Sequence, residues 1–295
     1  MHELLHVDMV GPDEFRGLCS EGSPGRAFGG HIAAQALAAV QRTIREGRSV
    51  HSLHGYFLTR GRPDREVRYV VQRLRDGNSY DLRGVTAWQE SDAIFTMTAS
   101  FKLPETDSSR HTLMPDVPAP ELLDEIGSGS DRTWANLDRT SPVGRAVEIR
   151  PIRAESHQAR EPGESRRSLW IRFAENLRSS PADHDCALTF LSDLALARTA
   201  VIGHSPSTAQ DPSTVFSTSL DHTIWFHRPC QADQWMLYTQ RSRVSGDGRG
   251  HTFGEIWSRQ GELIATTTQE VVLRSLRETT PVPAGAGRSQ PIRQP

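Results

Sequence analysis

Asp193 is the first residue whose type and surroundings could support acid–base chemistry. It lies in the apolar run Phe190-Leu191-Ser192-Asp193-Leu194, at the expected start of an apolar helix over Leu194–Ile202. A carboxylate at a helix start most often caps the helix by accepting backbone N–H groups. The same carboxylate could instead orient or deprotonate a water molecule. The pattern favours capping and leaves the catalytic interpretation open.

Three further polar residues lie in strand-like, mostly apolar segments. Ser219 and Asp221 alternate around Leu220, so in a strand they share one face of the sheet. Gln269 lies in the Thr-rich segment Ile264–Val271, and a buried glutamine needs partners for both its carbonyl and its amide group. These positions predict either a buried polar network or a site.

Gly29 and Gly30 open an earlier apolar segment. The first N–H groups of a helix lack intrahelical partners, so this end attracts an anion or a carbonyl oxygen. A tight turn that brings the backbone close to a sheet explains two adjacent glycines equally well. His54, His222 and His227 are possible acid–base residues, but histidines near aromatic residues are more often structural.

Several chemistries lack their sequence patterns. The chain has no Gly-x-Ser-x-Gly, Gly-x-Gly-x-x-Gly, P-loop or metal-ligand spacing. Its three cysteines indicate neither a disulfide framework nor a zinc site. We therefore expect no metal and no cofactor.

Composition narrows the class of protein further. The 295-residue chain has a net charge of −2, which gives no electrostatic basis for nucleic-acid binding. Lys102 is the only lysine, so the basic side chains are almost all arginine. No segment approaches the length of a spanning helix, and the N-terminus does not resemble a signal peptide. We expect a soluble, cytoplasmic protein that binds neither nucleic acid nor membranes.

The elements that must position these residues occur twice along the chain. Ser52-Leu53-His54 matches Ser219-Leu220-Asp221, and Gln72-Arg73-Leu74-Arg75 matches Gln240-Arg241-Ser242-Arg243. The Thr-rich segment Ile94–Phe101 matches Ile264–Val271. The offset between matching residues grows from 167 at Ser52 to 170 at Ile94. So many matches in one order indicate two copies of one unit.

The pattern of each copy predicts one buried helix followed by an antiparallel β-meander. The Ala-rich segment Ile32–Ile44 predicts a buried helix, with Leu194–Ile202 as its counterpart. β-branched and aromatic enrichment predicts six strands, Val67–Leu74, Leu82–Gln89, Ile94–Leu103, Trp235–Arg243, His251–Arg259 and Leu263–Arg274. The fold class is therefore α+β, with a sheet wrapped around a central helix.

The predicted organisation has four parts. Residues 1–104 form the first unit, and 168–278 form the second, which carries Asp193, Ser219 and Gln269. Residues 105–167 are rich in Pro, Ser, Asp and Arg and read as a linker with a short helix near Glu121–Ile126. Residues 279–295 are expected to be a disordered tail.

Six segments resemble the acyl-CoA thioesterase II (TesB-like) family in family order. They are Phe28-Gly29-Gly30-His31-Ile32-Ala33-Ala34-Gln35-Ala36-Leu37, Val50-His51-Ser52-Leu53-His54-Gly55-Tyr56-Phe57-Leu58, Leu74-Arg75-Asp76-Gly77-Asn78-Ser79-Tyr80, Leu191-Ser192-Asp193, Leu220-Asp221-His222-Thr223-Ile224-Trp225-Phe226-His227-Arg228-Pro229, and Thr267-Thr268-Gln269-Glu270-Val271. The resemblance implies a double hotdog, two fused units that each wrap a sheet around a long helix.

The same resemblance implies hydrolysis of acyl-CoA to a free acid and CoA. It carries the family's catalytic trio onto Asp193, Ser219 and Gln269, without a metal or a cofactor. Substrate-binding residues would be Gly29, Gly30, His31, His54 and Asp221, with His31 where many relatives have Gln. The family pattern also implies a homodimer or homotetramer.

Two alternatives remain open at this point. A double-hotdog enoyl-CoA hydratase or dehydratase would share the fold, but its clustered Asp, Asn-Pro and His motif does not occur here. A non-catalytic acyl-CoA binding protein would share the fold and the ligand, although an intact trio argues against it.

Overall fold

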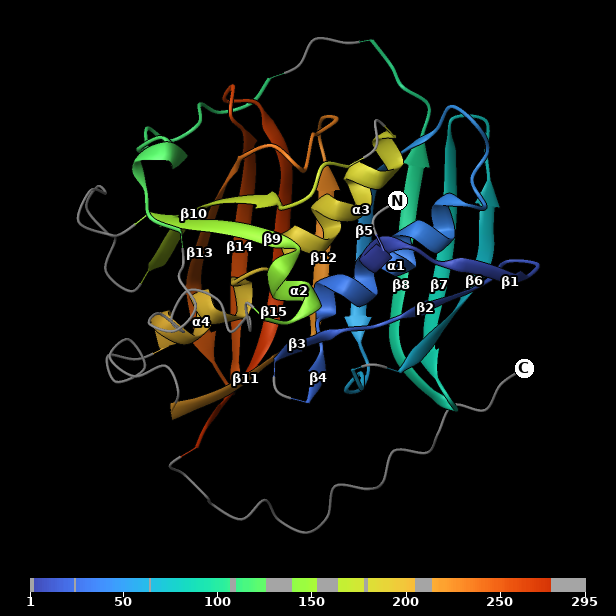
Figure 1. Ribbon diagram of the computed structural model, residues 1–295, viewed down its shortest axis with the longest axis horizontal. Coiled ribbons are helices and arrows are strands. Elements are labelled where there is room, and N and C mark those ends of the chain that lie inside the picture. The colour runs from blue at the N-terminus through green and yellow to red at the C-terminus, as the bar shows by residue number, and fades with distance from the viewer. Residues whose placement is uncertain are drawn as a thin grey trace.

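One large antiparallel sheet organises the chain. The computed structural model describes residues 3–23, 25–63, 65–106, 110–125, 140–152, 164–177, 180–204 and 214–276. Within these residues a thirteen-stranded sheet curves around central helices (Figure 1). Its strand order is β1-β2-β6-β7-β8-β5-β12-β15-β14-β13-β10-β9, with β11 paired to β15 and a separate β3–β4 pair. The predicted α+β class is confirmed.

The first half of the chain supplies one side of this sheet and one central helix. Its helical elements are η1 (Glu3–Leu5) and α1 (Gly29–Gln41). Its strands are β1 (Asp8–Gly11), β2 (Glu14–Leu18), β3 (Glu21–Ser23), β4 (Arg26–Ala27), β5 (Ser49–Phe57), β6 (Glu66–Asp76), β7 (Tyr80–Gln89) and β8 (Asp92–Lys102).

The second half supplies the other side of the sheet, three α-helices and one 3-10 helix. Its helical elements are η2 (Pro120–Leu122), α2 (Pro142–Arg145), α3 (Pro181–Ser192) and α4 (Leu196–His204). Its strands are β9 (Val147–Ile152), β10 (Ser165–Phe173), β11 (Val215–Ser219), β12 (Asp221–Phe226), β13 (Met236–Gly246), β14 (Arg249–Ser258) and β15 (Leu263–Ser275).

The two halves are joined through strands β5 and β12. Their antiparallel ladder runs from Asp221 opposite Tyr56 to Trp225 opposite Ser52. Because this ladder lies in the middle of the strand order, the sheet continues across the boundary between the halves. The two units therefore share backbone hydrogen bonds.

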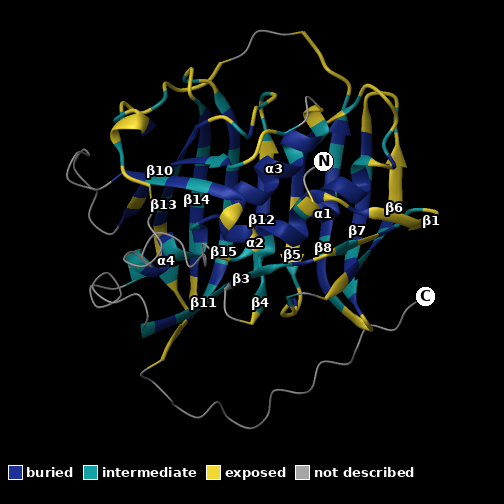
Figure 2. Cartoon of the chain, in the orientation of Figure 1, coloured by how far each residue is buried: buried dark blue, intermediate teal, exposed yellow. Residues whose placement is uncertain are grey.

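The core lies where helices α1 and α3 pack against each other inside the sheet. The helices run antiparallel: Gly30 at the start of α1 meets Phe190 near the end of α3, whereas Gln41 at the end of α1 bonds to Cys186. Every residue of α1 from Gly30 to Val40 is buried (Figure 2). Its many alanines allow this close packing on all sides.

The strand predictions are confirmed. All six predicted strands occur, as β6, β7, β8, β13, β14 and β15, with ends within three residues of those expected. The predicted helix over Ile32–Ile44 is α1, which begins three residues earlier, at Gly29.

The prediction for the second central helix was incomplete. A helix does occur near Leu194–Ile202, but it starts at Leu196, as α4, and packs on β13 and β14. The preceding helix α3 was not predicted, and Asp193 is the C-terminal cap residue of α3. The expectation that Asp193 caps the start of its own helix was therefore wrong.

The segment 105–167 is not all linker. It contains α2, strand β9 and the first residues of β10, and β9 forms the outer edge of the sheet. The short helix expected near Glu121–Ile126 is the single 3-10 turn η2. The predicted disordered tail, 279–295, lies outside the described residues.

Candidate active site

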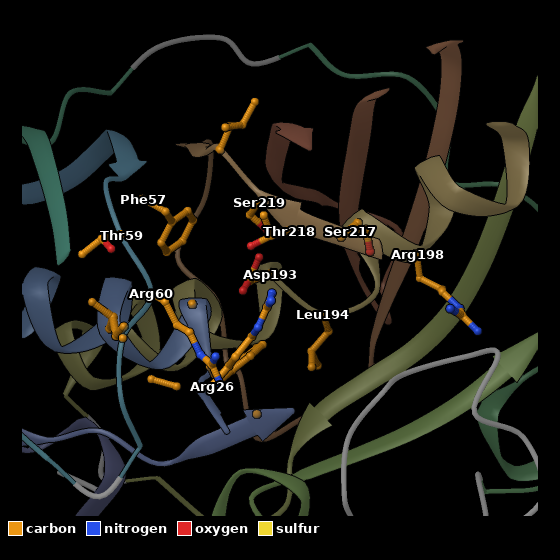
Figure 3. A pocket seen from close by; sticks show the side chains of 18 of the residues that line it. Arg26, Phe57, Thr59, Arg60, Asp193, Leu194, Arg198, Ser217, Thr218 and Ser219 are labelled. Atoms are coloured by element: carbon orange, nitrogen blue, oxygen red, sulfur yellow. The ribbon is translucent and has the colours of Figure 1, made fainter. Parts of the chain in front are cut away.

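A cavity of about 490 Å³ opens where the two halves meet. Its lining combines the start of α1, the end of β5, the turn between α3 and α4, and strand β11 (Figure 3). Asp193 is the acidic residue in this lining. Both halves contribute walls, so the cavity exists only in the joined molecule.

Asp193 reaches the cavity because the chain turns sharply after α3. The residue ends α3 with a right-handed helical backbone, and two residues later Ala195 adopts a left-handed conformation with φ of 66°. Such a conformation is costly for a residue with a side chain. The turn separates α3 from α4 and leaves the Asp193 carboxylate facing the cavity.

The Asp193 carboxylate accepts two hydrogen bonds, one from each half of the chain. The backbone N–H of Gly30 donates to Oδ2 at 2.8 Å, and the side-chain amide of Gln269 donates to Oδ1 at 2.6 Å. Asp193 thus lies at the N-terminus of α1, a helix of the other half. The anion expected at Gly29-Gly30 is a side chain of the protein itself.

Gly29 and Gly30 are required here by space. A Cβ on Gly30 would lie 2.5 Å from the backbone oxygen of Phe190, and one on Gly29 would lie 2.9 Å from Asp193 Oδ2. The first approach keeps α1 and α3 in contact. The second keeps the carboxylate accessible from the cavity.

Burial dominates the electrostatics of Asp193. Its desolvation raises the pKa of the carboxyl group to about 6, although the hydrogen bonds from Gln269 and Gly30 lower it in part. A carboxylate with this pKa is ionised at neutral pH and is a stronger proton acceptor than an ordinary aspartate.

Gln269 is oriented by a chain of hydrogen bonds behind Asp193. His222 Nδ1 lies 3.3 Å from the Gln269 amide nitrogen, and its Nε2 lies 2.8 Å from Ser192 Oγ, which donates to the backbone oxygen of Thr189. Burial lowers the pKa of His222 to about 3, so this ring is neutral. Its Nδ1 therefore accepts a hydrogen bond from the Gln269 amide, and its Nε2–H donates one to Ser192 Oγ.

This series of hydrogen bonds leaves one acceptor atom of Gln269 without a partner among the described residues. Both amide hydrogens of Gln269 point to partners, Asp193 and His222. The Gln269 carbonyl oxygen is buried and has no hydrogen-bond partner among the described residues. A buried acceptor without a partner is costly, and it fits a site that a water molecule fills when substrate chemistry takes place.

Ser219 lies on the same cavity and comes from the end of β11 (Figure 3). Leu220 separates β11, which ends at Ser219, from β12, which begins at Asp221, and both strands pair with β15. Asp221 makes a different contact from Ser219, because its carboxylate accepts a hydrogen bond from the backbone N–H of Glu270 at 2.6 Å. Asp221 is outside the cavity lining.

The other two residues carried over by resemblance also lie outside the cavity lining. The fully buried His31 ring contacts the backbone of Leu4 and Ser20 at the opposite side of α1. His54 lies on the exposed face of β5, where its ring packs edge-on against Trp225 at 5.3 Å. Of the five residues in that group, Gly29 lines the cavity and Gly30 binds Asp193.

Arg26, Arg60 and Phe57 line the cavity and were missed by the sequence interpretation. The arginine excess was noted there without an assignment. Arg26 lies just before the Gly29-Gly30 pair, and Arg60 follows the aromatic end of the strand that begins near Ser49. Their closeness to two motifs was the available signal.

The described residues contain neither a metal-binding cluster nor a membrane-spanning helix. No cluster of three or more His, Cys, Asp or Glu side chains there has a geometry that could hold a metal ion. None of the helices there has the length and apolar character needed to cross a membrane.

Comparison with known proteins places both halves in one family. Residues 20–102 match the acyl-CoA thioesterase N-terminal domain, and residues 117–273 match the acyl-CoA thioesterase C-terminal domain. The second match covers more than half of the chain and begins inside the segment first interpreted as a linker.

Individual relatives agree with this assignment. The chain is 33% identical to acyl-coenzyme A thioesterase 8 of Homo sapiens over 92% of this chain and 88% of that one. The crystal structure of acyl-CoA thioesterase II TesB2 from Mycobacterium marinum covers 92% of this chain and 97% of that one, with a TM-score of 0.78 and 34% identity.

A third comparison concerns the fold alone. A protein from Alicyclobacillus acidocaldarius described as having a hot dog fold shares 22% identity and a TM-score of 0.73, over 92% of this chain and 97% of that one. This likeness supports the hot dog fold. The two domain matches and the two relatives above show that the chain belongs to the acyl-CoA thioesterase II (TesB-like) family.

Proposed function

We propose that the protein hydrolyses acyl-CoA thioesters with a water molecule held by Asp193, Ser219 and Gln269. The observation that carries this proposal is the Asp193 carboxylate, which lines the cavity and bonds to Gln269 behind it, whose carbonyl oxygen has no hydrogen-bond partner among the described residues. The carboxylate can accept a proton from water, and the Gln269 oxygen can accept the other hydrogen. The Ser219 hydroxyl can donate to the oxygen of the same water.

The reaction then follows by ordinary acyl-transfer chemistry. Asp193 takes a proton as the water oxygen bonds to the thioester carbonyl carbon, which forms a tetrahedral intermediate. The intermediate collapses when the carbon–sulfur bond breaks and the CoA thiolate leaves. The proton on Asp193 passes to the departing thiolate or to solvent, which restores the carboxylate. No acyl-enzyme forms.

The start of α1 supplies stabilisation for the developing negative charge. The Gly30 N–H is committed to Asp193, so it is not available to the substrate. Gly29 lines the cavity, and no acceptor among the described residues bonds to its N–H. We assign the role of oxyanion donor to this N–H group.

We also propose that the protein is a double hotdog, forms a homo-oligomer and is cytoplasmic. Each half wraps an antiparallel sheet around a central helix, which supports a double hotdog. Among the described residues, edge strands β1 and β9 have no partner on their outer sides, which supports association into a homodimer or homotetramer. Its three cysteines are free thiols, as suits a reducing cytoplasm. The proposed chemistry uses no metal or cofactor.

Thiol release from a medium-chain acyl-CoA tests the proposal. Wild type should release thiol, and Asp193→Asn should lower kcat by about 10²–10⁴, the usual contribution of a general base. Asp92→Asn is the matched control, because Asp92 is exposed at the start of β8 and should leave the rate unchanged. Circular dichroism checks that all variants are folded.

Other outcomes identify other functions. Equal rates for wild type and Asp193→Asn would contradict the role of Asp193. Loss of the enoyl absorbance of crotonyl-CoA without thiol release would identify a hydratase. Tight acyl-CoA binding with no reaction would identify a binding protein.

A further inference from the structure

We infer that Arg26 and Arg60 form a binding site for the phosphate groups of the CoA carrier at the mouth of the cavity. This inference rests on the proposed function and deepens it. It assigns recognition of the carrier, as distinct from the acyl chain, to two named side chains. It also predicts that the enzyme discriminates between phosphorylated and unphosphorylated thioesters.

The charges that line the cavity are strongly unbalanced. Three arginines, Arg26, Arg60 and Arg198, share the lining with Asp193 as the acidic residue. The whole chain, by contrast, has a net charge of −2. A concentration of positive charge at one concave surface attracts anionic ligands and guides them to it.

Arg26 and Arg60 also differ in their partners from the arginines that form ion pairs in this structure. Neither has a carboxylate partner among the described residues. Arg60 donates through Nε to the backbone oxygen of Gly25 at 2.8 Å. The guanidinium of Arg26 lies over the ring of Phe216, 4.6 Å from its centroid. Both side chains are held in place by neutral groups, so their charges remain available to a ligand.

The two guanidinium groups are close enough to repel. Partial burial lowers the pKa of Arg26, and the charge of Arg60 lowers it further. Two like charges held together at a cavity are stabilised when an anion binds between them. Arginine suits this task, because its planar group donates paired hydrogen bonds to phosphate oxygens.

The position of the pair fits the proposed chemistry. Arg26 lies on β4, two residues before Phe28 and the start of α1, and Gly25 ties Arg60 to the same segment. Figure 3 shows both side chains on the opposite side of Asp193 from Ser219. A CoA thioester can therefore place its phosphates at the arginines while its carbonyl meets the water near Asp193.

Three thioesters that share one acyl group separate carrier recognition from catalysis. Octanoyl-CoA carries a diphosphate and a 3′-phosphate, octanoyl-dephospho-CoA lacks the 3′-phosphate, and octanoyl-pantetheine has no phosphate. We would measure kcat and KM for each with wild type, Arg26→Ala, Arg60→Ala and the double variant. Arg62→Ala is the control, because Arg62 pairs with Glu90 and does not line the cavity.

The expected result is a loss that depends on the phosphates. For octanoyl-CoA, each single variant should raise KM about tenfold and the double variant about a hundredfold, with kcat nearly unchanged. For octanoyl-pantetheine, all variants should match wild type. Added salt should raise the KM for octanoyl-CoA more in wild type than in the double variant.

Two results would overturn the inference. Equal losses on all three thioesters would show that the arginines support the fold, and no loss on octanoyl-CoA would show that they do not bind it. Titration calorimetry with free CoA provides a readout that does not require hydrolysis. If wild type binds CoA through these arginines yet releases no thiol, the proposed function fails and this inference stands.

Discussion

At the scale of single residues, Asp193 is placed under two opposing demands. In the proposed reaction it must be ionised to accept a proton, but burial favours its neutral form. The hydrogen bonds from Gly30 and Gln269 favour the ionised form, and the resulting pKa of about 6 lies just below neutral. The residue is therefore charged at pH 7 and basic enough to take a proton from water.

The pH dependence of hydrolysis should report this pKa. Only the ionised carboxylate accepts the proton, so kcat/KM should be constant above pH 7 and fall about tenfold per pH unit below about pH 6. Rates of thiol release between pH 4.5 and 8.5 would provide the profile. A midpoint near pH 4, the ordinary value for an aspartate, would contradict the assigned environment.

The stability of the fold gives an independent check on the same group. Because the folded-state pKa of Asp193 is raised, its contribution to stability is fully present below about pH 4 and is lost as pH rises through about 6. Asp193→Asn removes this dependence. The variant should gain at most about 3 kcal/mol over wild type at pH 7.5, and the gain should vanish near pH 4. Denaturant unfolding at both pH values measures the difference.

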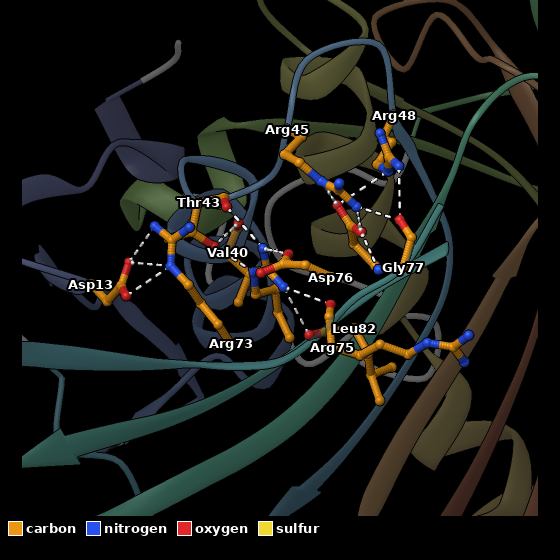
Figure 4. Close-up of polar contacts among 12 residues, drawn as sticks. Asp13, Val40, Thr43, Arg45, Arg48, Arg73, Arg75, Asp76, Gly77 and Leu82 are labelled. Carbon is orange, nitrogen blue, oxygen red and sulfur yellow. Dashed lines mark hydrogen bonds and ion pairs between the residues drawn. The ribbon is translucent and has the colours of Figure 1, made fainter. Parts of the chain in front are cut away.

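Arginines in this protein serve two different purposes. Arg83 is fully buried, and its five N–H groups bond to Thr43, to Asp76 and to two further backbone oxygens, which ties the end of α1 to the β6–β7 hairpin (Figure 4). Such a saturated side chain is structural. Arg26 and Arg60 keep unpaired charges beside a cavity. The arginine-rich composition is therefore no guide to function until partners are known.

At the scale of elements, the site depends on how closely α1 approaches α3. The backbone of Gly30 passes so near Phe190 that no side chain fits between them. This contact fixes the start of α1 against the end of α3. The hydrogen bond from Gly30 to Asp193 is a consequence of the same contact.

Gly30→Ala should therefore impair both stability and activity. Its Cβ would lie 2.5 Å from a backbone oxygen, so the helices must separate. We expect a loss of about 1–3 kcal/mol of stability and at least a tenfold loss of kcat. Thermal melts and thiol release measure the two effects. Gly246→Ala is the control, because nothing lies within 4 Å of its added Cβ; a variant at Gly30 that behaves like this control would refute the packing argument.

The elements that sequence predicted well are those with local signals. Strands such as β7 and β15 are predicted by their β-branched residues and turn-forming neighbours, and α1 is predicted by its alanines. The residues Asp193, Ser219 and Gln269 were identifiable as polar positions in apolar surroundings. The structure places Asp193 and Ser219 on the same cavity and bonds Gln269 to Asp193.

The elements that sequence missed depend on tertiary packing. Helix α3 contains Asp183, His184 and Asp185 near its start, polar residues that are typical of a loop, yet Asp183 and His184 are buried in the folded chain. No local pattern shows that Gly30 of one half bonds to Asp193 of the other, because that contact spans 163 positions. The guanidinium of Arg26 packs over the ring of Phe216, a residue even more distant in sequence.

At the scale of the whole molecule, the described strands form one continuous sheet that carries the candidate site. The β5–β12 ladder closes the gap between two similar units, and Leu53 and Ile224, paired across it, are fully buried. The Asp193 carboxylate comes from the second unit, while the helix N-terminus that it binds comes from the first. The two halves contribute equal numbers of strands to the main strand order but differ in chemistry, since Ala99 of the first half matches Gln269 of the second.

Splitting the chain between Pro104 and Glu105 tests this dependence, because the cut falls just after β8. Either fragment alone exposes an unpaired central strand, β5 or β12, and lacks half of the cavity, so neither should release thiol from acyl-CoA. Co-expressed fragments should pair through β5 and β12 and regain measurable activity. Co-expression with Asp193→Asn in the second fragment is the control and should remain inactive. If the second fragment alone hydrolysed acyl-CoA at the rate of the intact chain, the first half would be dispensable to the site, and the role given to the α1 N-terminus would be wrong.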